Sequence, residues 1–167
     1  MDGGGIEPDI KIDESERSEF EEALIRRSAF SRFAGTYAAS VDTLPVDFEV
    51  DDGLLYAFRD WIGDNPEFDY VTEAERQLET FREEFREGDY QESLEVLEDL
   101  ESAIIRDKAR DFDRDRVRIR ERLRRALIAR FYPETDQIEA ALRHDQLVLS
   151  AIDLFKDPER YHELLHP

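Results

Sequence analysis

Cysteine is absent from this chain of 167 residues, so it can form no disulfide, no thiolate metal site and no cysteine nucleophile. It also lacks any run of eighteen apolar residues, and its first residues show no basic stretch followed by an apolar one. We therefore expect neither a membrane span nor a signal peptide in this sequence. Any chemistry must come from serine, histidine or carboxylate side chains.

The charge balance is strongly acidic. Acidic residues number 43 against 23 basic ones, which gives a net charge of −20 at pH 7. Such a surface repels phosphate backbones and anionic lipids, so we expect no nucleic-acid partner and no insertion into membranes. Lysine occurs only at Lys11, Lys108 and Lys156, and the other basic residues are arginines. Acid excess with little lysine is typical of halophilic proteins and indicates the source rather than the function.

The apolar content is sufficient for a folded domain. Hydrophobic residues make up 40% of the chain and aromatic residues 11%, which is too much for a disordered chain. Residues 1–13 predict a glycine turn and a short extended segment. Pro8 disfavours a helix, and Ile6, Ile10 and Ile12 are spaced by even numbers of residues, so that they would lie on one face of a strand. No second strand pattern follows. The sequence therefore predicts a mainly α fold, in which residues 14–167 form a multi-helix, bundle-like domain.

Capping signals and apolar spacing locate the helices. Ser18 and Thr72 each stand three residues before a glutamate, as in a capping box. Gly88 is the expected end of one helix, and Pro158 suits the first turn of another. The predicted helices cover residues 19–40, 52–62, 73–88 and 90–133 with a break near Asp113, followed by two or three short helices within 138–165.

Charge is segregated along these helices. Residues 67–101 contain fourteen acidic residues and three arginines, whereas residues 106–130 contain eleven basic and five acidic residues. An arginine-rich helix can bind nucleic acid, but this one lacks interleaved aromatic side chains. We expect its arginines to be paired with the chain's own acids, foremost those of the preceding helices.

One motif has the spacing of a metal site. His162, Glu163 and His166 form an H-E-x-x-H sequence, in which two histidines one helical turn apart bind zinc and the glutamate activates a water. The motif stands at the last residues of the sequence, and no sheet is expected to support it. We favour an ordinary amphipathic helix end over adventitious metal capture or a zinc peptidase, and we expect no cofactor.

Two other motifs are incomplete. Residues 111–122 begin like a calcium loop, but Arg116 stands where glycine is needed and Arg122 where a chelating glutamate is needed. Gly3, Gly4 and Gly5 lack the strand and the Lys-Ser/Thr pair of a phosphate loop. No serine lies in a G-x-S-x-G turn. We assign no catalytic residue to this sequence.

The glycine segment nevertheless resembles a known family. The segment at 3–10 reads G-G-G-I-E-P-D-I and is similar to the G-G-G-[IV]-x-P-[DE]-[IV] stretch that closes the core of the C-terminal-processing, or tail-specific, proteases. The residues that carry this similarity are Gly3, Gly4, Gly5, Ile6, Pro8 and Asp9. F-S-R-F-A at 30–34, F-E-V-D-D at 48–52 and L-F-K-D-P-E-R-Y at 154–161 resemble the helical extension of one bacterial branch.

This resemblance implies a periplasmic or otherwise extracytoplasmic serine endopeptidase, with a Ser–Lys dyad and a PDZ domain that binds substrate C-termini. Both parts would lie upstream of Met1, which then looks like a start chosen to isolate the tail. Residues 1–13 would be the remnant of the last strand of the protease core. No catalytic residue of the family can be carried onto this sequence.

We therefore expect a non-catalytic helical C-terminal domain that serves self-association, positioning of the protease core or control of substrate access. Its partners would be the core of the same polypeptide and, through it, protein substrates. The alternative is a free-standing acidic helical scaffold or adaptor, and a zinc peptidase is a weaker third.

Aromatic residues crowd the first two predicted helices. Phe30, Phe33, Tyr37, Phe58 and Trp61 are more rings than two short helices can readily hide against each other. Aromatic anchors dominate protein interfaces, so these residues predict a homodimer surface. The alternative is that they pack into the core against the long helix.

Overall fold

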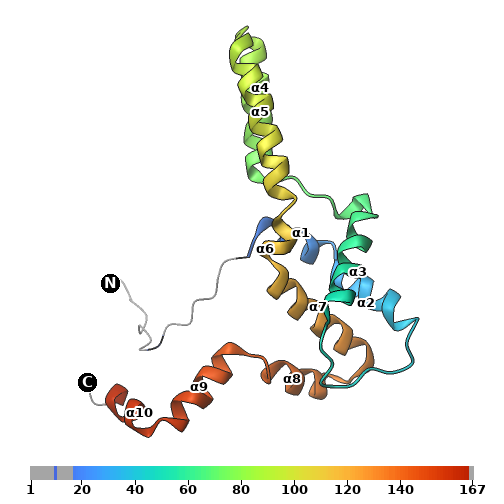
Figure 1. Ribbon diagram of the computed structural model, residues 1–167, viewed down its shortest axis with the longest axis vertical. Coiled ribbons are helices and arrows are strands. Elements are labelled where there is room, and N and C mark those ends of the chain that lie inside the picture. The colour runs from blue at the N-terminus through green and yellow to red at the C-terminus, as the bar shows by residue number, and fades with distance from the viewer. Residues whose placement is uncertain (1–9, 11–16, 166–167) are drawn as a thin grey trace, which may run out of the picture. The chain divides into compact units, whose positions relative to one another are not determined.

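The computed structural model describes residue 10 and residues 17–165, and every regular element among them is a helix (Figure 1). This confirms the predicted mainly α fold. The chain divides into two compact units. We call residues 17–131 the core unit, and residues 1–16 with 132–167 the tail unit. The predicted extended segment and glycine turn lie almost entirely outside the described residues.

The first predicted helix is divided in two, contrary to the prediction of one helix over 19–40. Helix α1 spans Glu19–Arg26 and α2 spans Ala29–Ala38. Between them Ser28 has a φ of 55°, in the left-handed region that ends a helix. The break has a packing reason: the step from Leu24 to Phe30 is out of phase with the helical repeat, and the turn restores a common buried side.

The predicted long helix is divided as well. Helix α5 spans Gln91–Lys108, the short α6 spans Asp111–Arg114, and α7 spans Arg116–Phe131. The predicted break near Asp113 is confirmed, although the chain interrupts the helix on both sides of α6. The turns allow Phe112 of α6 to be buried, with 7% of its surface exposed.

The centre of the core unit is built from α2, α7 and α3 (Asp52–Gly63). The ring of Phe58 lies 5.2 Å from those of both Phe30 and Phe33, and the chain of rings continues to Trp61. Helix α7 contributes four apolar side chains that are at most 2% exposed: Ile119, Leu123, Leu127 and Ile128. Each such side chain contributes about 1.5–3 kcal/mol through burial.

Ion pairs flank this apolar centre. The Glu21 carboxylate is buried and pairs with Arg122 and with Arg118, whose Nε lies 2.8 Å away. Glu121 lies 2.9 Å from the buried Arg124 guanidinium. Six of the seven arginines of α7 are thus paired with the chain's own acids, as predicted, and the seventh, Arg130, donates to the Ser31 carbonyl oxygen. Their partners differ from the acids of 67–101 that the sequence favoured.

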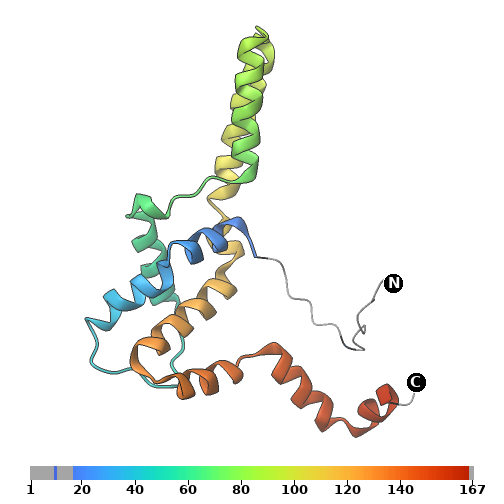
Figure 2. The same cartoon turned by 180° about the vertical axis from the view of Figure 1, so that it is seen from behind.

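Helices α4 (Glu73–Glu87) and α5 form an antiparallel hairpin that extends from the other helices of the core unit, as both views show (Figure 2). Thr72 opens α4 with a complete capping box, in which its hydroxyl accepts from Glu75 N at 3.1 Å. Gly88 ends the helix, as predicted. The short 3-10 helix η1 (Pro66–Phe68) joins α3 to this hairpin.

The tail unit contains α8 (Glu134–Leu142), α9 (Gln146–Lys156) and α10 (Pro158–Leu165). Asp145 caps α9, and Pro158 opens α10 as predicted. Burial is slight here: Ala140 is the one buried apolar residue among the described side chains of these helices, and α9 buries none. No helix in residues 17–165 is long and apolar enough to cross a bilayer.

Candidate binding site

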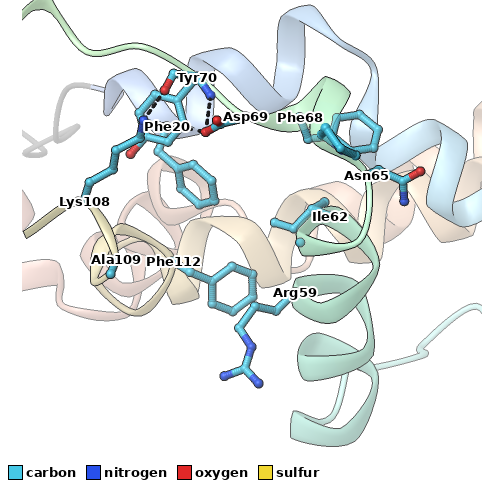
Figure 3. Close-up of a pocket in the computed structure, with 12 residues that line it drawn as sticks. Phe20, Arg59, Ile62, Asn65, Phe68, Asp69, Tyr70, Lys108, Ala109 and Phe112 are labelled. Atoms are coloured by element: carbon cyan, nitrogen blue, oxygen red, sulfur yellow. Dashed lines mark hydrogen bonds and ion pairs between the residues drawn. The ribbon is translucent and has the colours of Figure 1, made fainter. Parts of the chain in front are cut away.

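A pocket of about 470 Å³ lies in the core unit where α1, the end of α3, η1 and the α5–α6 turn meet (Figure 3). The side chains of Phe20, Ile62 and Phe112 point into this space. Its full lining is Phe20, Arg59, Ile62, Gly63, Asn65, Pro66, Phe68, Asp69, Tyr70, Lys108, Ala109 and Phe112. Most of these residues are apolar, and the pocket is open to solvent.

Tyr70 and Lys108 form the polar edge of the pocket. The Tyr70 hydroxyl donates a hydrogen bond to Asp111, and the Lys108 ammonium donates to the Tyr70 carbonyl oxygen. The same ammonium lies 4.4 Å from the centre of the Tyr70 ring and 3.1 Å from Glu75 Oε1. This edge therefore ties the base of the α4–α5 hairpin to α6.

The protonation states at this edge follow from the contacts. Burial, the hydrogen bond to Asp111 and nearby carboxylates together raise the pKa of Tyr70 far above its ordinary value, so the hydroxyl stays neutral. Burial opposes ionisation of Glu75, but hydrogen bonds from Thr72 and Lys108 outweigh it and lower the pKa. The ammonium is already engaged by the protein, so the pocket is suited to holding an apolar group rather than to acid–base chemistry.

The predicted metal motif is only partly described. His162 and Glu163 are exposed residues of α10, whereas His166 lies outside the described residues. Within residues 17–165 and residue 10, no three histidine or carboxylate side chains gather closely enough to hold a metal ion. Two acids of the segment that begins like a calcium loop form other contacts. Asp111 accepts a hydrogen bond from Tyr70, and Asp115 accepts hydrogen bonds from Ser18 and Arg118.

The aromatic residues expected at a dimer surface lie mostly in the core. Phe30, Phe33 and Phe58 are buried, at no more than 7% exposure, because their rings pack on one another and beside α7. Tyr37 and Trp61 are half-buried. A surface for self-association can therefore draw on Tyr37 and Trp61 but not on the other three rings. The family segment with Gly3, Gly4, Gly5, Ile6, Pro8 and Asp9 lies outside the described residues.

The tail unit exposes an apolar surface that the sequence analysis did not single out. Its large exposed side chains are Ile138, Leu142, Leu147, Leu149, Ile152, Phe155 and Tyr161, and Phe155 is 69% exposed. We call these seven residues the tail surface. Helix α9 could have signalled it in the sequence, because its apolar residues are too many for one face of an eleven-residue helix.

These features define a class of protein: a helical domain with an open, mainly apolar pocket and a set of exposed apolar side chains, whose described residues gather no metal-ligand cluster. Residues 20–155, most of the chain, match the family model described as "Probable PDZ-protease, C-terminal helical domain". The chain belongs to this family, which confirms the resemblance found in the sequence. Searches of curated proteins and of solved structures give no match.

Proposed function

We propose that this domain is the non-catalytic accessory part of a C-terminal-processing serine endopeptidase and that it positions the protease core through the tail surface. The family match supports a protease core of the same polypeptide as the partner. The observation that carries the proposal is the contrast in burial: seven large apolar side chains of α8–α10 are exposed, while those helices bury one apolar residue.

An apolar surface of this kind is typical of an interaction site. Its seven side chains come from three consecutive helices, so a partner that contacts several of them would engage α8–α10 together. The core unit supplies its own stability through α2, α3 and α7, which leaves the tail helices available for a partner. The family resemblance supports a location outside the cytoplasm and an action of the parent protease on protein substrates.

A binding experiment tests this role. The protease core of the parent enzyme is produced separately, and its affinity for this domain is measured by titration calorimetry. We expect the double variant Ile152→Ser/Phe155→Ser to bind at least ~10-fold more weakly, because two apolar contacts are lost. Val117→Ser is the matched control, since Val117 is an exposed apolar residue of α7 in the core unit, at 81% exposure.

Unchanged affinity of the double variant, or an equal loss in the control, would overturn the proposal. A domain that binds no protease core at all would favour the alternative of a free-standing acidic scaffold.

A further inference from the structure

The outer half of the α4–α5 hairpin has a second apolar surface, separate from the tail surface. The two helices are held together by Leu78 and Leu97, which are buried, and by an ion pair between Arg82 and Glu101 at 2.5 Å. This ion pair marks one side of the seam between the helices.

Helix geometry places other residues on the opposite side of that seam. Phe81 precedes Arg82 and Leu100 precedes Glu101, and each step back rotates a side chain by about 100°. Because the helices are antiparallel, the two rotations carry Phe81 and Leu100 to the same side of the hairpin. Val96 lies one turn before Leu100 and continues this side.

Aromatic contacts extend the surface to the hairpin turn. The Phe85 ring lies 6.1 Å from that of Phe81 and 5.7 Å from that of Tyr90. A Cβ on Gly88 would come within 2.3 Å of the Tyr90 ring, which shows how closely that ring covers the turn. The exposed fractions are 47% for Phe81, 58% for Tyr90, 66% for Val96 and 48% for Leu100. We call these four residues with Phe85 the hairpin surface.

The charges around the hairpin surface differ from those at the hairpin base. At the base, Lys108 lies 3.1 Å from Glu75, and Arg76 lies 2.9 Å from Glu73. The outer half, residues 83–99, has eight carboxylates and one arginine. None of the eight forms an ion pair within the described part of the chain. They are Glu83, Glu84, Glu87, Asp89, Glu92, Glu95, Glu98 and Asp99.

We propose that the hairpin surface docks a basic amphipathic segment of a partner protein. The apolar side chains would take the apolar face of that segment, and the surrounding carboxylates would attract its lysines or arginines. The same carboxylates repel an anionic membrane or the equivalent hairpin of a second copy. The occupant is therefore a protein segment of opposite charge, and the proposal does not depend on the role of the tail surface.

The test uses the full chain and a labelled probe. The probe is an eighteen-residue helical peptide of leucine and lysine with its leucines on one face, and binding is followed by fluorescence anisotropy. We expect Val96→Ser/Leu100→Ser to weaken binding at least ~10-fold. Ile105→Ser is the matched control, because Ile105 is 55% exposed on the same helix and lies one turn after Glu101, on the ion-pair side. Circular dichroism checks that each variant keeps its helices.

Two double variants that each remove two negative charges distinguish docking at the hairpin surface from general electrostatic attraction to the acidic chain. Glu92 lies one turn before Val96, and Glu84 lies three residues after Phe81. Glu84→Gln/Glu92→Gln should weaken binding more than ~3-fold, whereas Asp42→Asn/Asp47→Asn, in the exposed loop before α3, should not. Equal effects of the two pairs, or unchanged binding of Val96→Ser/Leu100→Ser, would overturn the proposal. Self-association of the free chain that the same two serines abolish would also overturn it.

Discussion

The core unit and the tail unit are both helical and both rich in apolar residues, yet they differ in where those side chains lie. In the core unit, α2, α3 and α7 bury large rings and aliphatic chains against one another. In the tail unit, α9 buries none of its residues. The difference teaches that apolar content and helical spacing predict a helix but not its partner. Folding buries the large apolar side chains of the core unit and leaves those of the tail surface exposed.

The largest expected effect tests this contrast by truncating one ring in each unit. Phe58→Ala removes a fully buried ring that contacts those of Phe30, Phe33 and Trp61, and we expect it to lower the free energy of unfolding by about 3–5 kcal/mol. Phe155→Ala in α9 should change it by less than ~0.5 kcal/mol. Urea denaturation followed by circular dichroism measures both values. A comparable cost for the two variants would contradict the contrast.

A smaller effect is expected from the buried carboxylate of the core unit. Glu21→Gln takes away the charge that pairs with Arg118 and Arg122, each of which is about one-third exposed. We expect a loss of about 2 kcal/mol in unfolding free energy, because the two guanidinium groups can recover only part of their hydration. The control is Glu22→Gln, whose ion pair with Arg26 is exposed at 3.7 Å and should contribute nothing measurable. If both variants have the same unfolding free energy as the parent chain, the ion pairs of Glu21 do not stabilise the packing of α1 on α7.

The smallest expected effect is on the dependence of the unfolding free energy on low pH. Burial opposes ionisation of Glu121, but hydrogen bonds from Arg124 and Arg125 outweigh it, so its pKa lies below the ordinary value. The pKa of Glu75 is lowered as well. A folded-state pKa below the unfolded value contributes stability that is present above about pH 4.3 and is lost as the pH falls through the folded pKa. Glu121→Gln should therefore flatten the decline of unfolding free energy below about pH 4.3. If the unfolding free energy of Glu121→Gln declines as steeply with falling pH as that of the parent chain, other groups cause the acid sensitivity.

Much of the fold could be predicted because its signals are local. Thr72 with Glu75, Gly88 and Pro158 each act within one helical turn, and the structure has the predicted caps at these positions. The out-of-phase step from Leu24 to Phe30 indicates an interruption of the first predicted helix. Its place at Ser28 could not be predicted, since serine has no particular preference for the left-handed backbone.

The candidate site and the buried ion pairs of the core unit were harder to predict because their parts are far apart in sequence. Tyr70 meets Asp111 across 41 residues, and Glu21 meets Arg122 across 101. The sequence marks Glu21 only as part of a capping box, and nothing local indicates that its carboxylate is buried. The apolar residues of α9 are too many for one helix face, which indicates that some are exposed, but the spacing does not show which ones, because a helix with the same pattern can be packed or unpacked.

Hydrogen exchange measured by mass spectrometry tests the central claim most directly, with the domain alone and with the parent protease core added. The account predicts that amides of α7 are protected in both samples, and that amides of α8–α10 exchange rapidly in the isolated domain and become protected when the core binds. Tail helices that are already as protected as α7 in the isolated domain, or that exchange at the same rate with and without the core, would contradict it.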